Sequence, residues 1–217
     1  MLLGRITGTA RGELAPGIVE DLADLVDLVD QSPSVRAVVL AGTHPDRFLI
    51  EGSRPRSAAQ LLLFHDTLLR MNGSDAVFVA ALNGSALGAG CELALACDAR
   101  VMAEGPYGFG LAGPPIGYLP GGGGTQRLPR LIGAHRALAH ILLGAAMTPA
   151  EAMRSGAVDA VVPSGDDVLA AAIDLAGRYC SRDRATVGAA KRCVWFGSSM
   201  ELEDGLAMER AEFLRRR

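Results

Sequence analysis

The sequence predicts an α/β fold with a mostly parallel sheet, and three observations support this prediction. Two apolar runs, 76–82 and 35–40, the latter with Arg36 as its only polar residue, contain β-branched residues and lack polar alternation, as expected for strands that are covered on both faces. Segments with helical spacing lie between them, and such alternation favours parallel strands with helical layers. After residue 165 only helical patterns remain. We therefore expect an α/β core over 1–165 and a helical tail over 166–217.

Local signals justify the elements that precede the second apolar run. Residues 2–8 are typical of a short strand, and Pro16 begins a helix with one apolar face. Ser and Pro residues at 32–34 end this helix. A polar loop over 42–55 and a helix over about 56–70 complete this part of the chain.

The elements after the second run begin with a glycine-rich turn. An apolar helix at 91–97 and a strand at 98–103 follow. A capping box at Thr148–Glu151 begins a helix that ends at Gly156, and a strand at 157–162 comes next. A capping box at Ser198–Glu201 begins the last helix. Arginines at 127, 130 and 136 have the spacing of a solvated helix face.

Composition and charge exclude several classes of protein. The 217 residues are 49% hydrophobic and 21% charged, with a formal net charge of −3. These values fit one globular domain with an appendage, and they argue against disorder and nucleic-acid binding. No apolar run approaches the roughly 18–20 residues of a membrane span, and Arg5 and Arg11 interrupt any secretory signal. We therefore expect a soluble, cytoplasmic protein with no membrane partner.

Motifs for phosphate and metal binding are missing. The only lysine, Lys191, lies far from any glycine-rich turn, so a P-loop cannot form. The four histidines have no ligand spacing, and the four cysteines include no CxxC pair. We therefore expect neither a metal site nor a disulfide framework.

The glycine-rich turn at 83–90 joins a buried strand to a helix, where backbone N–H groups favour an anion. Its glycines, Gly84, Gly88 and Gly90, have the spacing GxxxGxG. This spacing matches neither the dinucleotide-binding pattern GxGxxG nor the nucleophile elbow GxSxG. Of the three chemistries that use such a turn, an oxyanion hole for a thioester or ester carbonyl remains.

Glu92 is the only polar side chain between Gly90 and Asp98, in a helix that is apolar on every face. Such a helix is normally buried, and a buried carboxylate must be paired or functional. Two roles fit this position: Glu92 complements the helix dipole, or it is a general acid/base beside an oxyanion hole.

Three segments resemble the enoyl-CoA hydratase/isomerase (crotonase) family: AALNGSALGAGCELALACDARVMAE, FGLAGPPIGYLPGGGGTQRLPRLIG and MTPAEAMRSGAVDAVVP. The resemblance runs from about residue 35 to the C-terminus. It implies a crotonase-like spiral of β-β-α turns, followed by a C-terminal helical segment, 166–217, that packs a homotrimer or hexamer together. It also implies an acyl-CoA thioester as the partner molecule, with coenzyme A as part of the substrate and no separate cofactor.

The same resemblance assigns roles to residues of two glycine-containing segments. It implies that the backbone N–H groups of Ser53 and Ala89 hold the enolate oxygen of the thioester, and that Glu92 is the general acid/base. The substrate-binding positions that it implies are Gly52, Leu87, Gly88 and Gly90.

Two of the departures from the family pattern remove a carboxylate. Gly113 stands where hydratases carry a second catalytic carboxylate, and Arg54 stands where an aspartate is usual. With one carboxylate, such a site can still hold an enolate and perform a single-base step. Tyr118 is an additional candidate for proton transfer, and Glu51 and Glu104 are alternatives for the second group.

The resulting expectation is an enoyl-CoA hydratase-like lyase or isomerase that acts on an acyl-CoA or acyl-carrier thioester in fatty acid metabolism. One alternative is a non-catalytic or auxiliary subunit of the same fold, and another is a decarboxylase or dehydratase of natural-product biosynthesis. Glycine at position 113 favours the alternatives, whereas the retention of Glu92 favours the enzyme.

Overall fold

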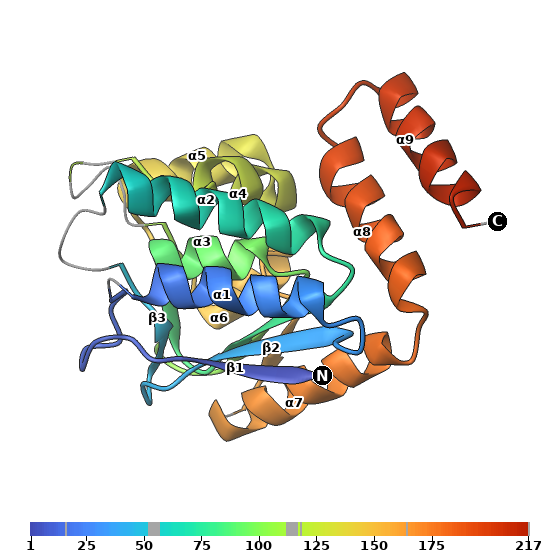
Figure 1. Cartoon of the computed structure of the whole chain (residues 1–217). Helices are drawn as coiled ribbons and strands as arrows, with labels where there is room; N and C mark the ends of the chain where they lie inside the picture. The colour runs from blue at the N-terminus through green and yellow to red at the C-terminus, as the bar shows by residue number, and fades with distance from the viewer. Residues whose placement is uncertain (16, 52–56, 112–116, 118, 164, 217) are drawn as a thin grey trace.

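Two parallel β-sheets organise the chain (Figure 1). The computed structural model describes residues 1–15, 17–51, 57–111, 117, 119–163 and 165–216. The larger sheet has the order β1-β2-β4-β6-β8, and the smaller sheet has the order β3-β5-β7. Strands of the larger sheet are β1 (Leu2–Ile6), β2 (Ala37–Gly42), β4 (Val77–Leu82), β6 (Ala99–Ala103) and β8 (Ala160–Val162). Strands of the smaller sheet are β3 (Arg47–Leu49), β5 (Ser85–Leu87) and β7 (Phe109–Gly110).

The chain forms a spiral in which each turn adds one strand to each sheet and then a helix. The three turns are β2-β3-α2, β4-β5-α3 and β6-β7-α4, with α2 at Ala58–Gly73, α3 at Ala89–Ala96 and α4 at Gly124–Ile132. Every strand pair in both sheets is parallel, which requires a return of the chain between neighbouring strands. The expected α/β spiral of β-β-α turns is therefore confirmed.

The remaining helices cover the larger sheet or extend from the core. Helix α1 (Ile18–Gln31) lies on the same side of the sheet as α2, and α7 (Gly165–Cys180) lies on the opposite side (Figure 1). The other helices are α5 (Ala134–Leu143), α6 (Pro149–Ser155), α8 (Arg184–Gly197) and α9 (Leu202–Leu214).

The central strands of the larger sheet, β2, β4 and β6, are buried on both faces, as the apolar runs predict. Alternate residues of a strand point to opposite faces. On one face, Leu40 and Phe78 pack with α1, α2 and α3 in the main core. On the other face, Val39 and Val79 pack against α7, which contributes Val168, Ala172 and Ala176. The first helix after residue 165 thus covers the sheet, and an oligomerisation role for 166–217 stays a prediction.

Some local predictions are wrong. The polar loop expected over 42–55 contains β3, and the glycine-rich turn at 83–90 contains β5. Ser198 ends α8, and Glu201 is the N-cap of α9 without a side-chain cap, so the capping box expected there does not form. The capping box of Thr148 and the helix end at Gly156 are confirmed.

Helix α8 is attached to the core by a buried ion pair. The Lys191 ammonium lies 2.8 Å from a carboxylate oxygen of Asp98 and also donates to the Met71 carbonyl. Asp98 accepts further hydrogen bonds from Trp195 Nε1, at 3.1 Å, and from the backbone N–H of Phe78, at 2.8 Å. Two elements that are distant in sequence, α8 and β4, therefore converge on one carboxylate.

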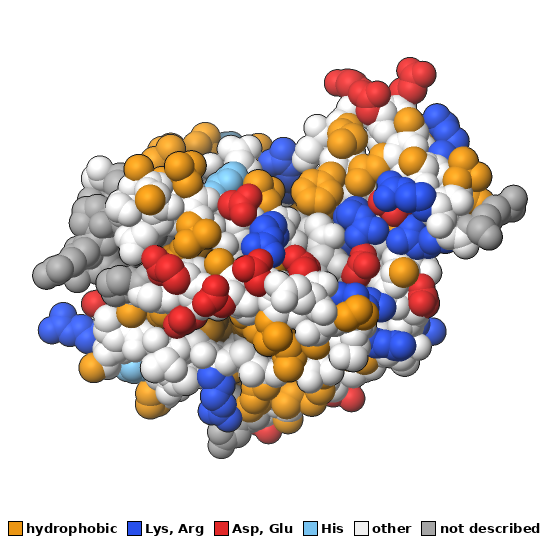
Figure 2. All heavy atoms as spheres, viewed as in Figure 1, with side chains coloured by type: hydrophobic (Ala, Val, Ile, Leu, Met, Phe, Trp, Pro, Cys, Tyr) orange, Lys and Arg blue, Asp and Glu red, His pale blue; other side chains and the backbone are white. Residues whose placement is uncertain are grey.

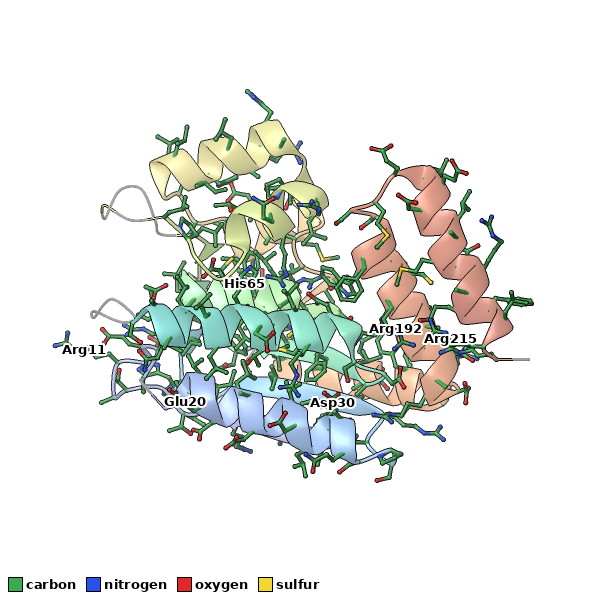
Figure 3. All side chains as sticks on the ribbon, turned by 45° about the horizontal axis from the view of Figure 1, so that its top comes forward. Arg11, Glu20, Asp30, His65, Arg192 and Arg215 are labelled. Carbon is green, nitrogen blue, oxygen red and sulfur yellow. The ribbon has the colours of Figure 1, made fainter. Side chains whose placement is uncertain are left out.

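Helix α9 is attached to α8 by a second charged cluster. Arg192 and Arg215 lie close together where the two helices meet (Figure 3), and both contact the buried carboxylate of Glu212. Hydrogen bonds from Arg192 and Arg216 hold the pKa of Glu212 at about 2.

Within the described residues, no helix is both long enough and apolar enough to cross a membrane.

Candidate active site

Glu92 is a buried carboxylate in the first turn of α3, with 1% of its surface exposed. Its Oε1 accepts hydrogen bonds from the backbone N–H groups of Gly122, at 2.7 Å, and Gly124, at 3.0 Å. The burial expected from the apolar helix is therefore confirmed, and the N–H groups compensate for the lost hydration of the carboxylate.

The second glycine-rich segment of the chain, 121–124, packs closely against Glu92, and residues larger than glycine would not fit at positions 122 and 124. A Cβ atom on Gly122 would lie 2.7 Å from Glu92 Oε2 and 2.5 Å from an edge atom of Phe64. A Cβ atom on Gly124 would lie 2.5 Å from Leu111 and 3.1 Å from Glu92 Cγ. The backbone at 122–124 can thus approach the carboxylate only if glycine occupies these positions.

Arg127 holds this glycine loop in place through hydrogen bonds. Its guanidinium donates to the Gly122 carbonyl at 2.9 Å and to Asn72 Oδ1 at 3.0 Å. Asn72 in turn donates to the carbonyl of Ala96, the last residue of α3, at 2.8 Å. Burial lowers the pKa of Arg127, and the charge of Glu92 acts in the opposite direction. The expected solvated position is wrong for Arg127, because its side chain is buried.

Ala89 is the first residue of α3, and its N–H group points to a carboxylate of the same chain. The backbone nitrogen of Ala89 donates to Oε2 of Glu51 at 2.9 Å. Glu51 follows β3, and Ala89 follows β5, which pairs with β3 in parallel. The pairing of the small sheet therefore brings these two positions together.

The glycines of the first turn permit this close approach. Gly88 has a φ of +56°, and a Cβ atom there would lie 2.6 Å from Glu51 Cβ. A Cβ atom on Gly90 would lie 1.8 Å from the carbonyl oxygen of Leu49. Leu87, another predicted substrate-binding residue, is half-buried in β5 and pairs with Gly110 of β7.

The structure brings together part of the predicted site. Ala89 and Glu92 lie in the first turn of one helix, and Gly88 and Gly90 lie at its start. Four other predicted residues, Gly52, Ser53, Gly113 and Tyr118, lie outside the described residues.

Glu51 and Glu104, the two glutamates considered for the second carboxylate, lie in different parts of the structure. Glu51 contacts the Ala89 N–H, whereas Glu104 is exposed after β6 and its backbone N–H donates to Val162 of β8. Glu104 is therefore an exposed carboxylate at the end of β6, where its backbone pairs with β8 and not with the elements of the site.

The sequence-based reasoning missed the partners of Glu92. The run of glycines at 121–124 has no predicted role, and Arg127 is expected on a solvated helix face. A signal was present, because a buried carboxylate needs donors and a run of glycines exposes backbone N–H groups. The sequence alone does not say that these two features meet.

This arrangement has two parts that are useful for thioester chemistry. An N–H group at the start of a helix stabilises negative charge on an oxygen. A buried carboxylate held by two N–H groups can take or give a proton at a fixed position. Both parts belong to the first turn of α3.

Comparisons with known proteins identify the family that this chain resembles. The profile of the enoyl-CoA hydratase/isomerase family matches residues 9–215. The chain is 34% identical over 211 residues to the 2,3-dehydroadipyl-CoA hydratase of Escherichia coli strain K12, which covers 94% of this chain and 81% of that protein. It is 31% identical to the fatty acid oxidation complex subunit alpha of Shewanella amazonensis, covering 97% of this chain and 36% of that protein.

Solved structures show the same fold. An enoyl-CoA hydratase from Bacillus anthracis superposes with a TM-score of 0.88 at 30% sequence identity, covering 97% of this chain and 85% of that chain. A second hydratase structure, from Geobacillus kaustophilus, also gives a TM-score of 0.88, at 27% identity, and covers 97% of this chain and 83% of that chain.

Proposed function

Because the chain belongs to the enoyl-CoA hydratase/isomerase family, which indicates an enzyme of the lyase or isomerase type, we propose that it acts on an acyl-CoA or acyl-carrier thioester through an enolate. In this proposal the Ala89 N–H donates to the thioester oxygen, and the Ser53 N–H is the second donor. Glu92 is the general acid/base.

One observation carries this proposal: Glu92 is buried beside the start of the helix whose first N–H group is that of Ala89. When a base removes a proton from the α-carbon of a thioester, or when water adds to the β-carbon of an enoyl thioester, negative charge moves to the carbonyl oxygen. The positive end of α3 stabilises that charge. Glu92 is the base that takes the proton from the α-carbon or from the attacking water, and it then delivers this proton to a carbon atom of the enolate, which completes the isomerisation or the hydration. Its hydrogen bonds to Gly122 and Gly124 fix its position.

The substitution Glu92→Gln tests this role. Gln has nearly the same shape, and its carbonyl oxygen can accept the N–H groups of Gly122 and Gly124, but it cannot accept the reacting proton. We expect the kcat for crotonyl-CoA hydration or enoyl-CoA isomerisation to fall by about 10²–10⁴-fold. Thioester affinity, measured by calorimetry with acetyl-CoA, and the melting temperature should change little.

Glu104→Gln is the matched control, because Glu104 is an exposed carboxylate outside the site. It should leave kcat, affinity and melting temperature unchanged. A Glu92→Gln variant that keeps full kcat would exclude a catalytic role for Glu92. A small loss of stability with intact activity would instead assign Glu92 to helix-dipole compensation.

A second candidate function is that of an auxiliary subunit that keeps the fold without turnover. The observation that favours it is the glycine at position 113, where the resemblance implies a second carboxylate. A thermal-shift series with crotonyl-CoA, acetyl-CoA, malonyl-CoA and free coenzyme A separates the two functions. A ligand at 100 times its Kd adds about 2.7 kcal/mol of apparent stability, so the absence of any shift would favour the auxiliary subunit.

A further inference from the structure

The donor that the proposed function assigns to the thioester oxygen is already engaged by a side chain of the protein. Oε2 of Glu51 accepts the Ala89 N–H at 2.9 Å. A carboxylate oxygen resembles an enolate oxygen, because both are anionic acceptors that favour the start of a helix. Glu51 thus stands in for the oxygen that the proposed reaction creates.

The contact is built by two independent features of the fold. The first feature is the pairing of the Ile50 backbone with the segment at 12–14. The N–H group of Ile50 donates to the Gly12 carbonyl at 3.0 Å, and the carbonyl of Ile50 accepts the Leu14 N–H at 2.9 Å. The next residue is Glu51. On the other side, glycine at position 88 leaves the space that the Glu51 side chain fills, since a Cβ atom there would lie 2.8 Å from Glu51 Oε2.

We propose that Glu51 determines the affinity of the site by competing with the thioester oxygen for the Ala89 N–H; this inference rests on the proposed function. A thioester oxygen can take this donor in a linear hydrogen bond only after the carboxylate leaves it. The apparent Kd of a thioester then rises in inverse proportion to the fraction of molecules in which the donor is open. If about one molecule in ten is open, affinity is about tenfold weaker than that of a site without the competitor.

Glu51→Ala removes the competitor. We expect the Kd of acetyl-CoA, measured by isothermal titration calorimetry on the full chain, to fall about tenfold, which corresponds to about 1.4 kcal/mol. Free coenzyme A has no acyl oxygen, so its Kd should change by less than about twofold. Glu51→Gln keeps the shape and an acceptor oxygen but removes the charge, so its Kd for acetyl-CoA should lie between those of the other two proteins.

Glu13→Ala is the charge control. Glu13 belongs to the segment that pairs with Ile50, so this variant removes one negative charge near Glu51 and leaves the Glu51 contact in place. It should not tighten acetyl-CoA binding. The NMR signal of the Ala89 amide provides a readout without thioester, and it should shift in Glu51→Ala and Glu51→Gln but not in Glu13→Ala.

The outcomes separate this inference from the proposed function. Tighter acetyl-CoA binding by Glu51→Ala alone supports competition, including the case in which only this variant binds measurably. If the wild-type protein binds acetyl-CoA and Glu51→Ala binds it no more tightly, competition is wrong while the thioester site stands. Equal tightening for free coenzyme A would identify simple charge repulsion and overturn the inference. A loss of kcat without tighter binding would make Glu51 a catalytic carboxylate and would also overturn it. If neither protein binds any thioester, both proposals fail.

Discussion

At the scale of single residues, the close approach of the glycine loop to Glu92 gives a sharp prediction. Gly122→Ala places a Cβ atom 2.5 Å from Phe64 and 2.7 Å from Glu92 Oε2. Both neighbours are buried, so the loop or the carboxylate must move. We expect the free energy of unfolding to fall by about 1–3 kcal/mol, measured by urea denaturation, together with a lower kcat.

Gly177→Ala in α7 is the matched control for this substitution. A Cβ atom on Gly177 meets no atom within 4 Å, and alanine favours a helix over glycine by up to about 1 kcal/mol. This variant should be neutral or slightly more stable. If both alanine variants behave alike, crowding at Gly122 is not the cause.

How far the site can be predicted from the sequence also differs residue by residue. Glu92 stands out because its neighbours in the chain are apolar, which is local information. Its donors, Gly122 and Gly124, lie 30 and 32 residues further on. The contact between Glu51 and Ala89 joins positions 38 residues apart and depends on the register of two short strands. Sequence patterns identify the groups, but the fold decides which groups meet.

At the scale of elements, the buried ion pair between Lys191 and Asp98 attaches α8 to the core. Lys191→Met would leave Asp98 with its N–H donors and without its counter-charge. Removing one partner of a buried pair typically costs about 3–5 kcal/mol. We expect a loss of this size in the free energy of unfolding, measured by urea denaturation.

The surface pair of Arg70 is the control for the buried pair. Arg70 contacts Asp27 and Asp30, whose side chains are 51% and 42% exposed, and surface pairs contribute up to about 1 kcal/mol. Arg70→Met should therefore cost much less than Lys191→Met. If both variants lose the same free energy of unfolding, the Lys191–Asp98 pair contributes no more than a surface pair.

Elements differ in how well the sequence predicts them. Strands β2 and β4 are predicted because six consecutive apolar residues on two covered faces leave a continuous signal. The strands of the small sheet have three, three and two residues, which is too short for any period. These strands form because they pair in parallel with neighbouring strands that are distant in sequence. A local sequence pattern does not reveal such pairing.

At the scale of the whole molecule, the C-terminal helices expose apolar side chains. Figure 2 shows hydrophobic side chains gathered over α8 and α9. Val194, Leu202 and Phe213 are 69%, 77% and 59% exposed. Apolar surface of this kind marks an interface, so we expect a trimer or hexamer in sedimentation experiments at micromolar concentration.

A double variant, Leu202→Glu with Phe213→Glu, should dissociate this assembly, because each charge would be buried without a partner in the interface. The control is Leu28→Glu, which changes an exposed leucine of α1 and should leave the assembly intact. Sedimentation of the wild-type protein as a monomer would contradict the prediction.

The attachment of α8 has a chemical consequence for a protein that handles activated acyl groups. Thioesters can acylate a free amine, and the side-chain amine of proteins is that of lysine. This chain has one lysine, Lys191, and its ammonium is buried against Asp98. All other basic side chains, apart from the histidines, are guanidinium groups, which stay protonated and are poor nucleophiles. While folded, the protein therefore presents no lysine side chain that its proposed substrates could modify.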